Sequence, residues 1–336
     1  MAVVNRTELD LEYEGNRITE KIAPYVTAFS YTDHEGGKAD DLQITVEDRD
    51  GLWKKSWFPP VGALLTAHIH IWGEAGKATL SCGTFAMDEI SFQGPPDTAE
   101  IKAVSSFTQK PIKREAKTRD WKNTTLETIA STVAKEYDLK FFHTGSRVTL
   151  DRMEQRQESD LAFIKRLCDD FDFNVKISHG KIILFENKAF ELREPAFSIV
   201  RGGTAIGGYG FRATTQDTYK ACRVSYWDAE KKEEIKHTFT PPSTPAVGQT
   251  FVVNQRMENL KMAEIKSRAM LRRKNSQEIT GSFELMGDPA LLAGMPGTIS
   301  GFGAFDGKYI ITQAVHTYGR SQGYRTQIQI RKAMTW

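Results

Sequence analysis

The sequence predicts a mostly β fold with an inserted α/β part, and three observations lead to this prediction. Residues in the first third alternate between apolar and polar, with the period of about two that strands have. The middle third changes to a helical spacing of apolar residues, about 3.6 per turn. The last third returns to strand-like runs. We therefore expect three segments in this chain of 336 residues, 1–108, 109–198 and 199–336, with β structure in the outer two.

The first segment contains five runs with strand character. Leu42, Ile44 and Val46 point to one face of their run, and the residues between them point to the other. The expected strands are Glu8–Glu14, Leu42–Glu47, Leu64–Trp72, Leu80–Phe92 and Glu100–Ser105. The fourth run changes phase, so we expect a bend or bulge between Asp88 and Ile90. Short strands at this spacing indicate a barrel or a sandwich.

Large aromatic side chains follow the second expected strand. An acidic turn that ends at Gly51 leads to Trp53 and Trp57, and Pro59-Pro60 closes the stretch. We expect both tryptophans to be apolar anchors, in the β core or against the α/β segment, because burying such rings contributes a few kcal/mol each. Phe85, in the fourth strand, is expected to be a third anchor.

The middle segment has two helical stripes and a hairpin. Thr124 and Glu127 form a capping box at the start of the first helix. Ser159 is the expected N-cap of the second helix, whose stripe includes the anchors Leu161 and Ile164. The expected elements are helices over 124–137 and 159–171 and a hairpin over 173–185 that turns at Ser178-His179-Gly180.

The last segment opens with a glycine tract, Gly202–Gly210, which we interpret as a linker or a tightly turning junction. Asp228–Lys236 is expected to be a solvated hairpin tip. A helix is expected over Glu258–Lys274, acidic early and basic late, as the helix dipole favours. Tyr309 is a further expected anchor. The expected strands are Ala221–Trp227, Glu278–Leu285, Gly297–Ser300, Lys308–Tyr318 and Tyr324–Arg331.

The composition excludes several classes of protein. The net charge is +2, from 45 basic and 43 acidic residues, which does not support a dedicated binder of nucleic acid or membrane surfaces. No apolar run reaches the ~18 residues of a membrane span, and Met1–Asp10 lacks the apolar core of a signal peptide. Cys82, Cys168 and Cys222 are far apart in sequence and are expected to be reduced thiols, which indicates synthesis in the cytosol.

Three patterns suggest binding chemistry, and each has an ordinary structural reading that we prefer. His68 and His70 share a strand face and could form half of a metal site, but no third ligand is near in sequence. The tract Gly202–Gly210 lacks the spacing of a phosphate loop. Acidic residues at the end of the second helix oppose its dipole, and we expect a solvated face or a subunit contact there. These residues are Asp169, Asp170 and Asp172.

No catalytic set is visible in the sequence. Asp88 and Glu89 are adjacent in a strand, point to opposite faces and cannot flank one glycosidic bond. No G-x-S-x-G, H-E-x-x-H or cysteine–histidine arrangement occurs. We therefore expect no catalytic, cofactor-binding or metal-binding residue, and no enzyme activity.

Four blocks occur in the order of a known family. They are Asp40–Trp53 (DDLQITVEDRDGLW), Cys82–Ile90 (CGTFAMDEI) with Gly94–Thr98, Gln157–Leu167 (QESDLAFIKRL), and Gly287–Gly294 (GDPALLAG) with Phe305–Ile311, His316 and Gly323–Thr326. The chain thereby resembles the phage late control D family, the hub proteins of contractile tails, which are related to the hub part of type VI secretion spikes. The tract from Gly202 to Gln249 has no place in the family pattern.

The resemblance implies two tube-like β-barrel domains that flank the α/β domain. It implies a homotrimer that adapts the hexameric tail tube protein to the trimeric central spike protein and lines the central channel. Baseplate wedge proteins and the tape measure protein are further implied partners. DNA is a partner only in transit, and a membrane is not one. The implied location is the tail baseplate of a virion, assembled in the host cytoplasm.

Two expectations and two alternatives complete this interpretation. The sequence ends at Trp336 without a β-helical segment, so we expect the spike to be a separate protein. A channel that passes DNA is expected to lack a strong basic patch, because tight phosphate binding would impede transit. The alternatives are a tail-associated cell-wall hydrolase and a carbohydrate-binding β module. The sequence does not distinguish a phage from a headless bacteriocin particle.

Overall fold

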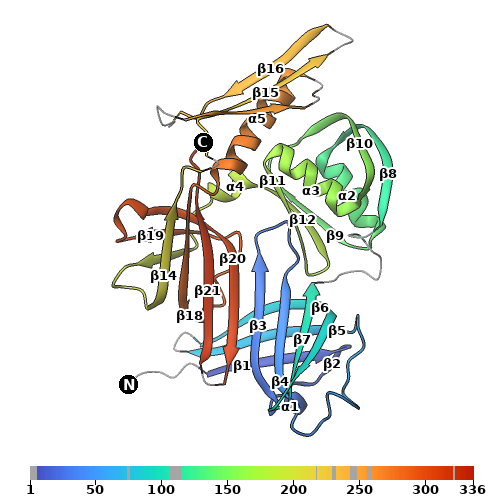
Figure 1. Cartoon of the computed structure of the whole chain (residues 1–336), viewed down its shortest axis with the longest axis vertical. Coiled ribbons are helices and arrows are strands. Elements are labelled where there is room, and N and C mark those ends of the chain that lie inside the picture. Colours follow the sequence, from blue (N-terminus) through green and yellow to red (C-terminus); the bar gives the residue numbers. More distant parts are fainter. Residues whose placement is uncertain are drawn as a thin grey trace.

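The computed structural model describes residues 6–73, 76–105, 112, 115–216, 218–228, 232–242, 248–255, 257, 259–320 and 322–336. It is elongated, with the N-terminal strands at one end and a small sheet over a helix at the other (Figure 1). The chain is mostly β, as the sequence predicts. Among the described residues, no helix has both the length and the apolar character needed to cross a bilayer.

The largest sheet has 13 strands and joins the two ends of the chain. Its order is β14-β18-β21-β20-β3-β4-β7-β6-β5-β1-β2, with β19 attached beside β20 and β13 beside β19. Its N-terminal strands are β1 (Arg6–Tyr13), β2 (Asn16–Arg17), β3 (Val26–His34), β4 (Asp41–Glu47), β5 (Leu64–Gly73), β6 (Gly76–Gln93) and β7 (Thr98–Ser105). Its C-terminal strands are β13 (Phe197–Val200), β14 (Ile206–Ala213), β18 (Ile279–Met286), β19 (Pro296–Ser300), β20 (Gly307–Gly319) and β21 (Gly323–Lys332).

The described strands do not close into two separate barrels. The N-terminal and C-terminal strands meet because β3 pairs with β20, which merges them into one open sheet. β3 was absent from the sequence prediction. The expected bulge in β6 is present, since its register with β7 shifts between Met87 and Glu89.

The middle segment contains the two expected helices, α2 (Leu126–Glu136) and α3 (Asp160–Phe171). Ser159 is the N-cap of α3, as predicted, but the N-cap of α2 is Thr125 instead of Thr124. The expected hairpin is β11 (Phe173–Ser178) with β12 (Lys181–Glu186), and β9 (Lys140–Thr144) pairs with β12. The other elements of this part are the ribbon of β8 (Ala116–Thr125) with β10 (Thr149–Ser159), and α4 (Asn187–Glu191).

The last segment divides between two places in the fold. A three-stranded sheet of β15 (Ala221–Asp228), β16 (Glu233–Phe239) and β17 (Thr250–Asn254) covers helix α5 (Leu260–Asn275). Buried residues of these elements share one apolar core with α2 and α3, whereas β18 to β21 have a core of their own. The remaining short helices are α1 (Thr19–Ile22) and the 3₁₀ turn Gly303–Phe305.

Two expectations for this segment are corrected. The linker interpretation of the glycine tract is wrong, because Gly207, Gly208 and Gly210 lie in β14; the tight turn at Gly202 is confirmed by its φ of 84°. The acidic first turn expected in the helix near 258–274 is absent from α5, whose last turn is basic. Residues 229–231 of the expected hairpin tip lie outside the described residues, and Glu233–Lys236 form the start of β16.

Candidate assembly surface

One face of the large sheet is mostly polar, although Met286, which is 65% exposed, and the half-buried Val315 and Val104 also lie on it. Residues opposite one another across successive strands share a face. The pairing registers connect such rows over β18, β21, β20, β3, β4, β7 and β6. One row is Arg325, Thr317, Ser30, Gln43, Lys102 and Glu89. A parallel row over the C-terminal strands is Ser282, Gln329 and Gln313. Hydroxyl and amide groups therefore dominate this face, which we call the polar face.

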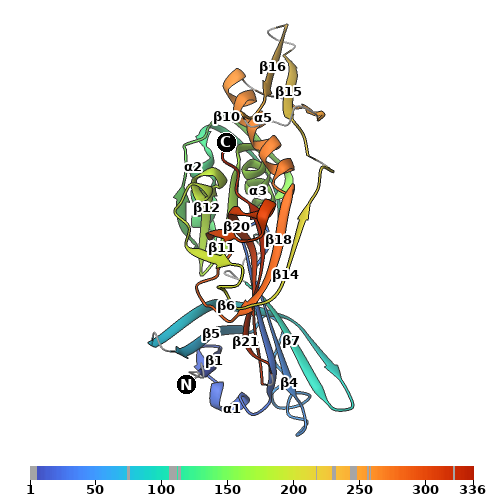
Figure 2. The ribbon, with the colours of Figure 1, turned by 90° about the vertical axis from the view of Figure 1, so that its left-hand side faces the viewer.

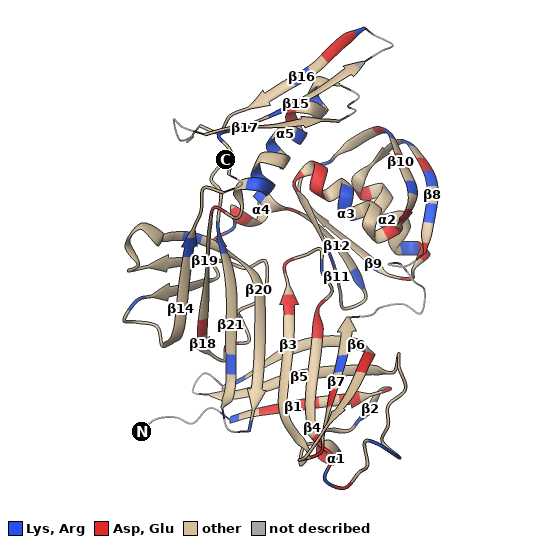
Figure 3. Ribbon diagram, viewed as in Figure 1, with Lys and Arg blue, Asp and Glu red and all other residues tan. Residues whose placement is uncertain are grey.

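The charges in these rows are paired. Arg325 lies 2.7 Å from Glu284, and Lys102 lies 3.3 Å from Glu100 and 3.5 Å from Glu89. Charged residues are sparse along β18, β20 and β21, whose ribbons are mostly tan in Figure 3. The described residues of these rows thus form a hydrophilic wall on which each cation has an acidic neighbour.

The opposite face of the same strands is apolar and covered. Its rows include Leu285, His316, Tyr31 and Leu42, all of which are buried. β1, β5 and the first part of β6 cover the N-terminal half, and β13 and β19 pack on the C-terminal half. Figure 2 shows β1 and β5 on one side of β4 and β7. The molecule therefore leaves one face of a two-layered structure open.

The part of the sheet that runs from β14 to the later half of β6 has an unpaired edge at each end, flanked by exposed apolar side chains among the described residues. β14 pairs only with β18 among the described strands, and beside it Tyr209 is 51% exposed. β6 beyond Met87 pairs only with β7 among the described strands, and beside it Phe58 is 52% and Val61 75% exposed. Phe58 stacks on Phe92 of this edge at 6.4 Å. Unpaired edges with apolar flanks are sites where chains associate.

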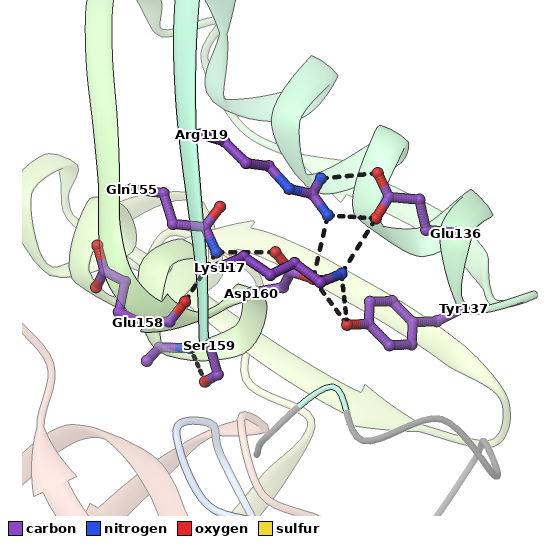
Figure 4. A network of polar contacts seen from close by, with 9 residues as sticks. Lys117, Arg119, Glu136, Tyr137, Gln155, Glu158, Ser159 and Asp160 are labelled. Atoms are coloured by element: carbon purple, nitrogen blue, oxygen red, sulfur yellow. Dashed lines mark hydrogen bonds and ion pairs between the residues drawn. The ribbon is translucent and has the colours of Figure 1, made fainter. Parts of the chain in front are cut away.

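A buried polar network holds the middle segment together (Figure 4). Asp160 is fully buried at the start of α3; it accepts hydrogen bonds from Lys117 and Tyr137 at 2.7 Å and from Gln155 at 2.9 Å. Burial raises the pKa of Asp160, but these hydrogen bonds outweigh it and hold the pKa below its ordinary value. The QESDL block that suggests the family thus contains the residue that ties β8, β10 and α2 to α3.

The acidic end of α3 is neutralised within the chain, which corrects the expected solvated face or subunit contact. Asp170 lies 2.9 Å from Lys266 of α5. Asp172 lies 2.7 Å from Arg272, and Asp169 lies 3.0 Å from Arg273. Lys266 in the first half of α5 and two arginines in its last turn therefore compensate the carboxylates that oppose the dipole of α3.

The expected anchors occupy the three apolar cores. Trp53 and Phe85 are buried in the N-terminal core, and Trp57 is partly buried against it. Ile164 is buried in the core of the middle segment and Leu161 is partly buried against it. Tyr309 is fully buried in the C-terminal core. The three cysteines are free and buried.

The residues considered for chemistry do not assemble into a site. His68 and His70 stack at 6.3 Å on β5, and His70 hydrogen-bonds with Thr79 at 2.9 Å. Within the described residues, no three His, Cys, Asp or Glu side chains are placed to hold a metal ion. His237 and Ser267 lie 2.8 Å apart, a pair that the sequence did not reveal, but Ser267 is fully buried and also bonds to a carbonyl of its own helix.

Comparison with known proteins identifies relatives among phage tail proteins. Residues 108–322 match the family model described as phage tail baseplate hub (GPD). The probable baseplate hub proteins of Escherichia phages 186 and P2 are 32% identical over 178 residues and 30% identical over 180 residues. Each match covers 52% of this chain and 44% of the phage protein, which is less than half of that protein's length.

The fold also matches a solved structure. The 43 kDa tail protein of prophage MuSo2 from Shewanella oneidensis superposes with a TM-score of 0.73 at 12% identity, covering 97% of this chain and 98% of that one. At this identity the similarity concerns the fold alone. The similarity extends over nearly the whole chain and therefore includes the open sheet as well as the middle segment.

Proposed function

Because this chain belongs to the phage tail baseplate hub (GPD) family, we propose that it is the structural hub of a contractile tail or a tail-like injection particle. In this proposal the chain is a homotrimer that connects the hexameric tail tube protein to the trimeric central spike protein. Its polar face lines the central channel. Assembly takes place in the host cytoplasm, and the mature location is the tail baseplate.

The observation that carries the proposal is the open sheet shared by the two ends of the chain. The C-terminal segment contributes four consecutive strands, β14, β18, β21 and β20, and the N-terminal segment contributes four more, β3, β4, β7 and β6. Each set has its own apolar core. Three copies would therefore repeat a similar four-stranded unit six times, which suits a sixfold partner on one side and a threefold partner on the other.

The two free edges support a head-to-tail ring. The eight strands alternate in direction, so β14 of one copy would continue the antiparallel order beyond β6 of the next. The edges are unlike, and joining unlike surfaces produces a closed ring when the rotation between copies closes, as about 120° does for three copies. In such a ring the exposed rings of Tyr209 and Phe58 would lie near the joints between copies. Closing a sheet also requires the strands to tilt and stagger.

In the ring the two outer segments, 1–108 and 199–336, act as tube-like units and 109–198 as the α/β insert. The polar face then faces the lumen. Its paired charges and many amide and hydroxyl groups suit a wall past which DNA moves, since unpaired cations would hold phosphates. Wedge proteins and the tape measure protein are further proposed partners.

We propose no catalytic role. His237 and Ser267 lie between β16 and α5, and the hydroxyl of the fully buried Ser267 is bonded within its own helix. Purified protein is expected to leave peptidoglycan intact in a zymogram. Cleavage that a His237→Ala change abolishes would instead support the hydrolase alternative.

Cysteine cross-linking tests the ring. The native cysteines are buried, so new surface cysteines react selectively. With a short bis-maleimide, the double variant Tyr209→Cys with Phe92→Cys is expected to give covalent dimers and trimers, and each single variant only monomers. Cross-linked dimers from Tyr209→Cys alone would indicate a twofold contact between like edges and would contradict the head-to-tail ring. Cryo-electron microscopy that placed a single copy off the tail axis would overturn the hub itself.

A further inference from the structure

The junction between the two halves of the sheet is a single ladder. β3 and β20 pair from Gln313 opposite His34 to Gly319 opposite Ala28. Neighbouring strands cross at angles that vary over about 25° between proteins. A ring of three requires each copy to turn the sheet by about 120°, and a ring of four by about 90°. This difference of about 30° is similar to the range of strand angles, so the ladder alone does not determine how many copies close a ring.

A second connection between the halves passes through the insert. The segment 173–191, which contains β11, β12 and α4, touches the N-terminal half at one end. There the backbone N–H of Gly37 donates to the carbonyl of Val175 at 3.1 Å. Lys176 forms a close ion pair with Asp33 and lies 3.4 Å from Asp40. The tip of the β3–β4 hairpin is therefore clamped by β11.

The other end of this segment is fixed to the C-terminal half. Glu191 of α4 is 2% exposed; it pairs with Arg331 of β21 and, at 2.6 Å, with Arg272 of α5. The N–H of Met334 also donates to Glu191 at 3.1 Å. Asn187 donates to Asp172 at 3.0 Å and accepts from Asn174 at 2.9 Å, which holds α4 against β11. The segment therefore forms a rigid strut between the two halves.

Arg331 joins all three parts at one side chain. It is almost fully buried, and its guanidinium reaches Glu191 of the insert and, at 3.0 Å, Glu35 of the N-terminal hairpin. A polar cavity of about 390 Å³ lies beside it. A planar guanidinium holds two carboxylates in a fixed relative position, whereas a lysine ammonium on a flexible stem does not.

We propose that the strut 173–191 and Arg331 fix the angle between the two halves of the sheet and thereby determine how many copies close the ring. Arg331 and Glu35 are positioning residues in this inference, which rests on the proposed trimer. In this inference the contacts between neighbouring edges provide the affinity of one copy for the next, and the strut sets the curvature of the sheet within each copy. Loosening the strut is expected to leave the joints intact and to spread the assembly over several sizes.

Two variants of the 336-residue chain test this inference by native mass spectrometry. Glu35→Ala removes the contact between Arg331 and the N-terminal hairpin, while Arg331 stays paired with Glu191 and Lys176 stays paired with Asp33. Arg331→Lys keeps the positive charge but loses the planar guanidinium that contacts Glu191 and Glu35 together. In both, the ratio of trimer to other assemblies is expected to fall at least tenfold, equivalent to about 1.4 kcal/mol. Matched controls are Asp120→Ala and Arg152→Lys, which alter an exposed acid–arginine pair, 3.2 Å apart, within the insert and are expected to leave the trimer unchanged.

Hydrogen exchange in the same samples identifies the cause. Faster exchange confined to the hairpin tip at 34–40, together with mixed assembly sizes, supports the inference. Faster exchange there with a wild-type trimer refutes the inference and leaves the proposed function standing. A wild-type protein that forms no trimer at any concentration refutes the proposed function itself. If Arg331→Lys fails to fold, the result for Glu35→Ala decides whether the inference stands. In that variant Arg331 keeps Glu191 as its partner, so no buried charge is left unpaired.

Discussion

Replacing Asp160 by asparagine is expected to loosen the insert more than any change to an exposed ion pair. The side chain is fully buried and is held by three hydrogen bonds of 2.7 to 2.9 Å, two of them from Lys117 and Tyr137. Asparagine has nearly the same shape, but its amide directs donor hydrogens at groups that are themselves donors. It also removes the anion beside Lys117 and beside Arg119, which lies 3.6 Å away.

The expected cost follows from what remains of the network. Breaking a buried ion pair by removing one partner costs about 3–5 kcal/mol. Lys117 and Arg119 keep Glu136 as a partner and are each about a fifth to a quarter exposed, so solvent screens part of the loss. We therefore expect the lower limit, about 3 kcal/mol. Each 1.36 kcal/mol changes an equilibrium constant about tenfold. Backbone amide hydrogens in α2 and α3 should therefore exchange with solvent roughly 150-fold faster in Asp160→Asn than in the wild type.

The control for this experiment is Asp120→Asn. Asp120 lies on β8, as Lys117 does, but its partners Arg152 and Lys122 are exposed. Surface ion pairs contribute about 0–1 kcal/mol, so exchange in this variant should change by less than about fivefold. If the amide exchange rates of Asp160→Asn in α2 and α3 were within threefold of the wild-type rates, the network around Asp160 would not be what holds α3 in place.

The difference in stability between the wild type and Asp160→Asn is expected to depend on pH, and the pKa of Asp160 gives the direction. The pKa of Asp160 is lowered in the folded chain. Its contribution to stability is therefore fully present above the ordinary carboxyl pKa, and it is lost as the pH falls through the lower folded value. The gap between the wild type and Asp160→Asn should accordingly be constant near neutrality and shrink below about pH 4.

Three further changes have expected outcomes. Trp53→Ala should cost about 3–5 kcal/mol because the ring is buried, and an unchanged thermal midpoint would contradict the anchor role. Burial lowers the pKa of His316 to about 4, so stability should fall by about 3 kcal/mol between pH 6.5 and pH 4, and this slope should be absent in His316→Asn. Burial raises the pKa of Asp40 to about 6 although Lys176 opposes this. Lys176→Met should lower the free energy of unfolding by about 3 kcal/mol at pH 8, and by less at pH 5, where Asp40 is protonated. Urea titrations at the two pH values measure this, and equal losses at both would refute the clamp.

The local sequence pattern was sufficient to predict the elements whose apolar residues recur at one regular spacing. α2, α3 and the β11–β12 hairpin were predicted because each has one apolar face and a cap or turn at its end. β8 and β10 gave no such signal. They form a two-stranded ribbon that is exposed along most of its length, so their residues have no reason to alternate between apolar and polar.

Pairings between distant parts of the sequence could not be predicted. β3 carries Thr32 and Asp33 as buried residues, which conceals its apolar alternation, and its partner β20 lies near the other end of the chain. The acidic end of α3 appeared solvated because its cations, on α5, come about a hundred residues later. Gly207, Gly208 and Gly210 suggested a linker, yet they form the edge strand of the sheet. In each case the partner that decides the structure is remote in sequence.

The open sheet connects folding with assembly. An unpaired strand edge is a liability for a single chain. Among the described strands, β14 and the part of β6 beyond Met87 have such edges, each with an exposed aromatic ring beside it. Tyr209 and Phe58 are each about half exposed, so the edges are suited to be covered by another copy. Association at the edges would then supply the backbone pairs that the single chain lacks. Because edge pairing is tolerant of angle, specificity for one ring size has to come from elsewhere in the chain. The buried ionic contacts around Arg331 join both halves of the sheet to the insert, which is the arrangement that a device for fixing curvature requires.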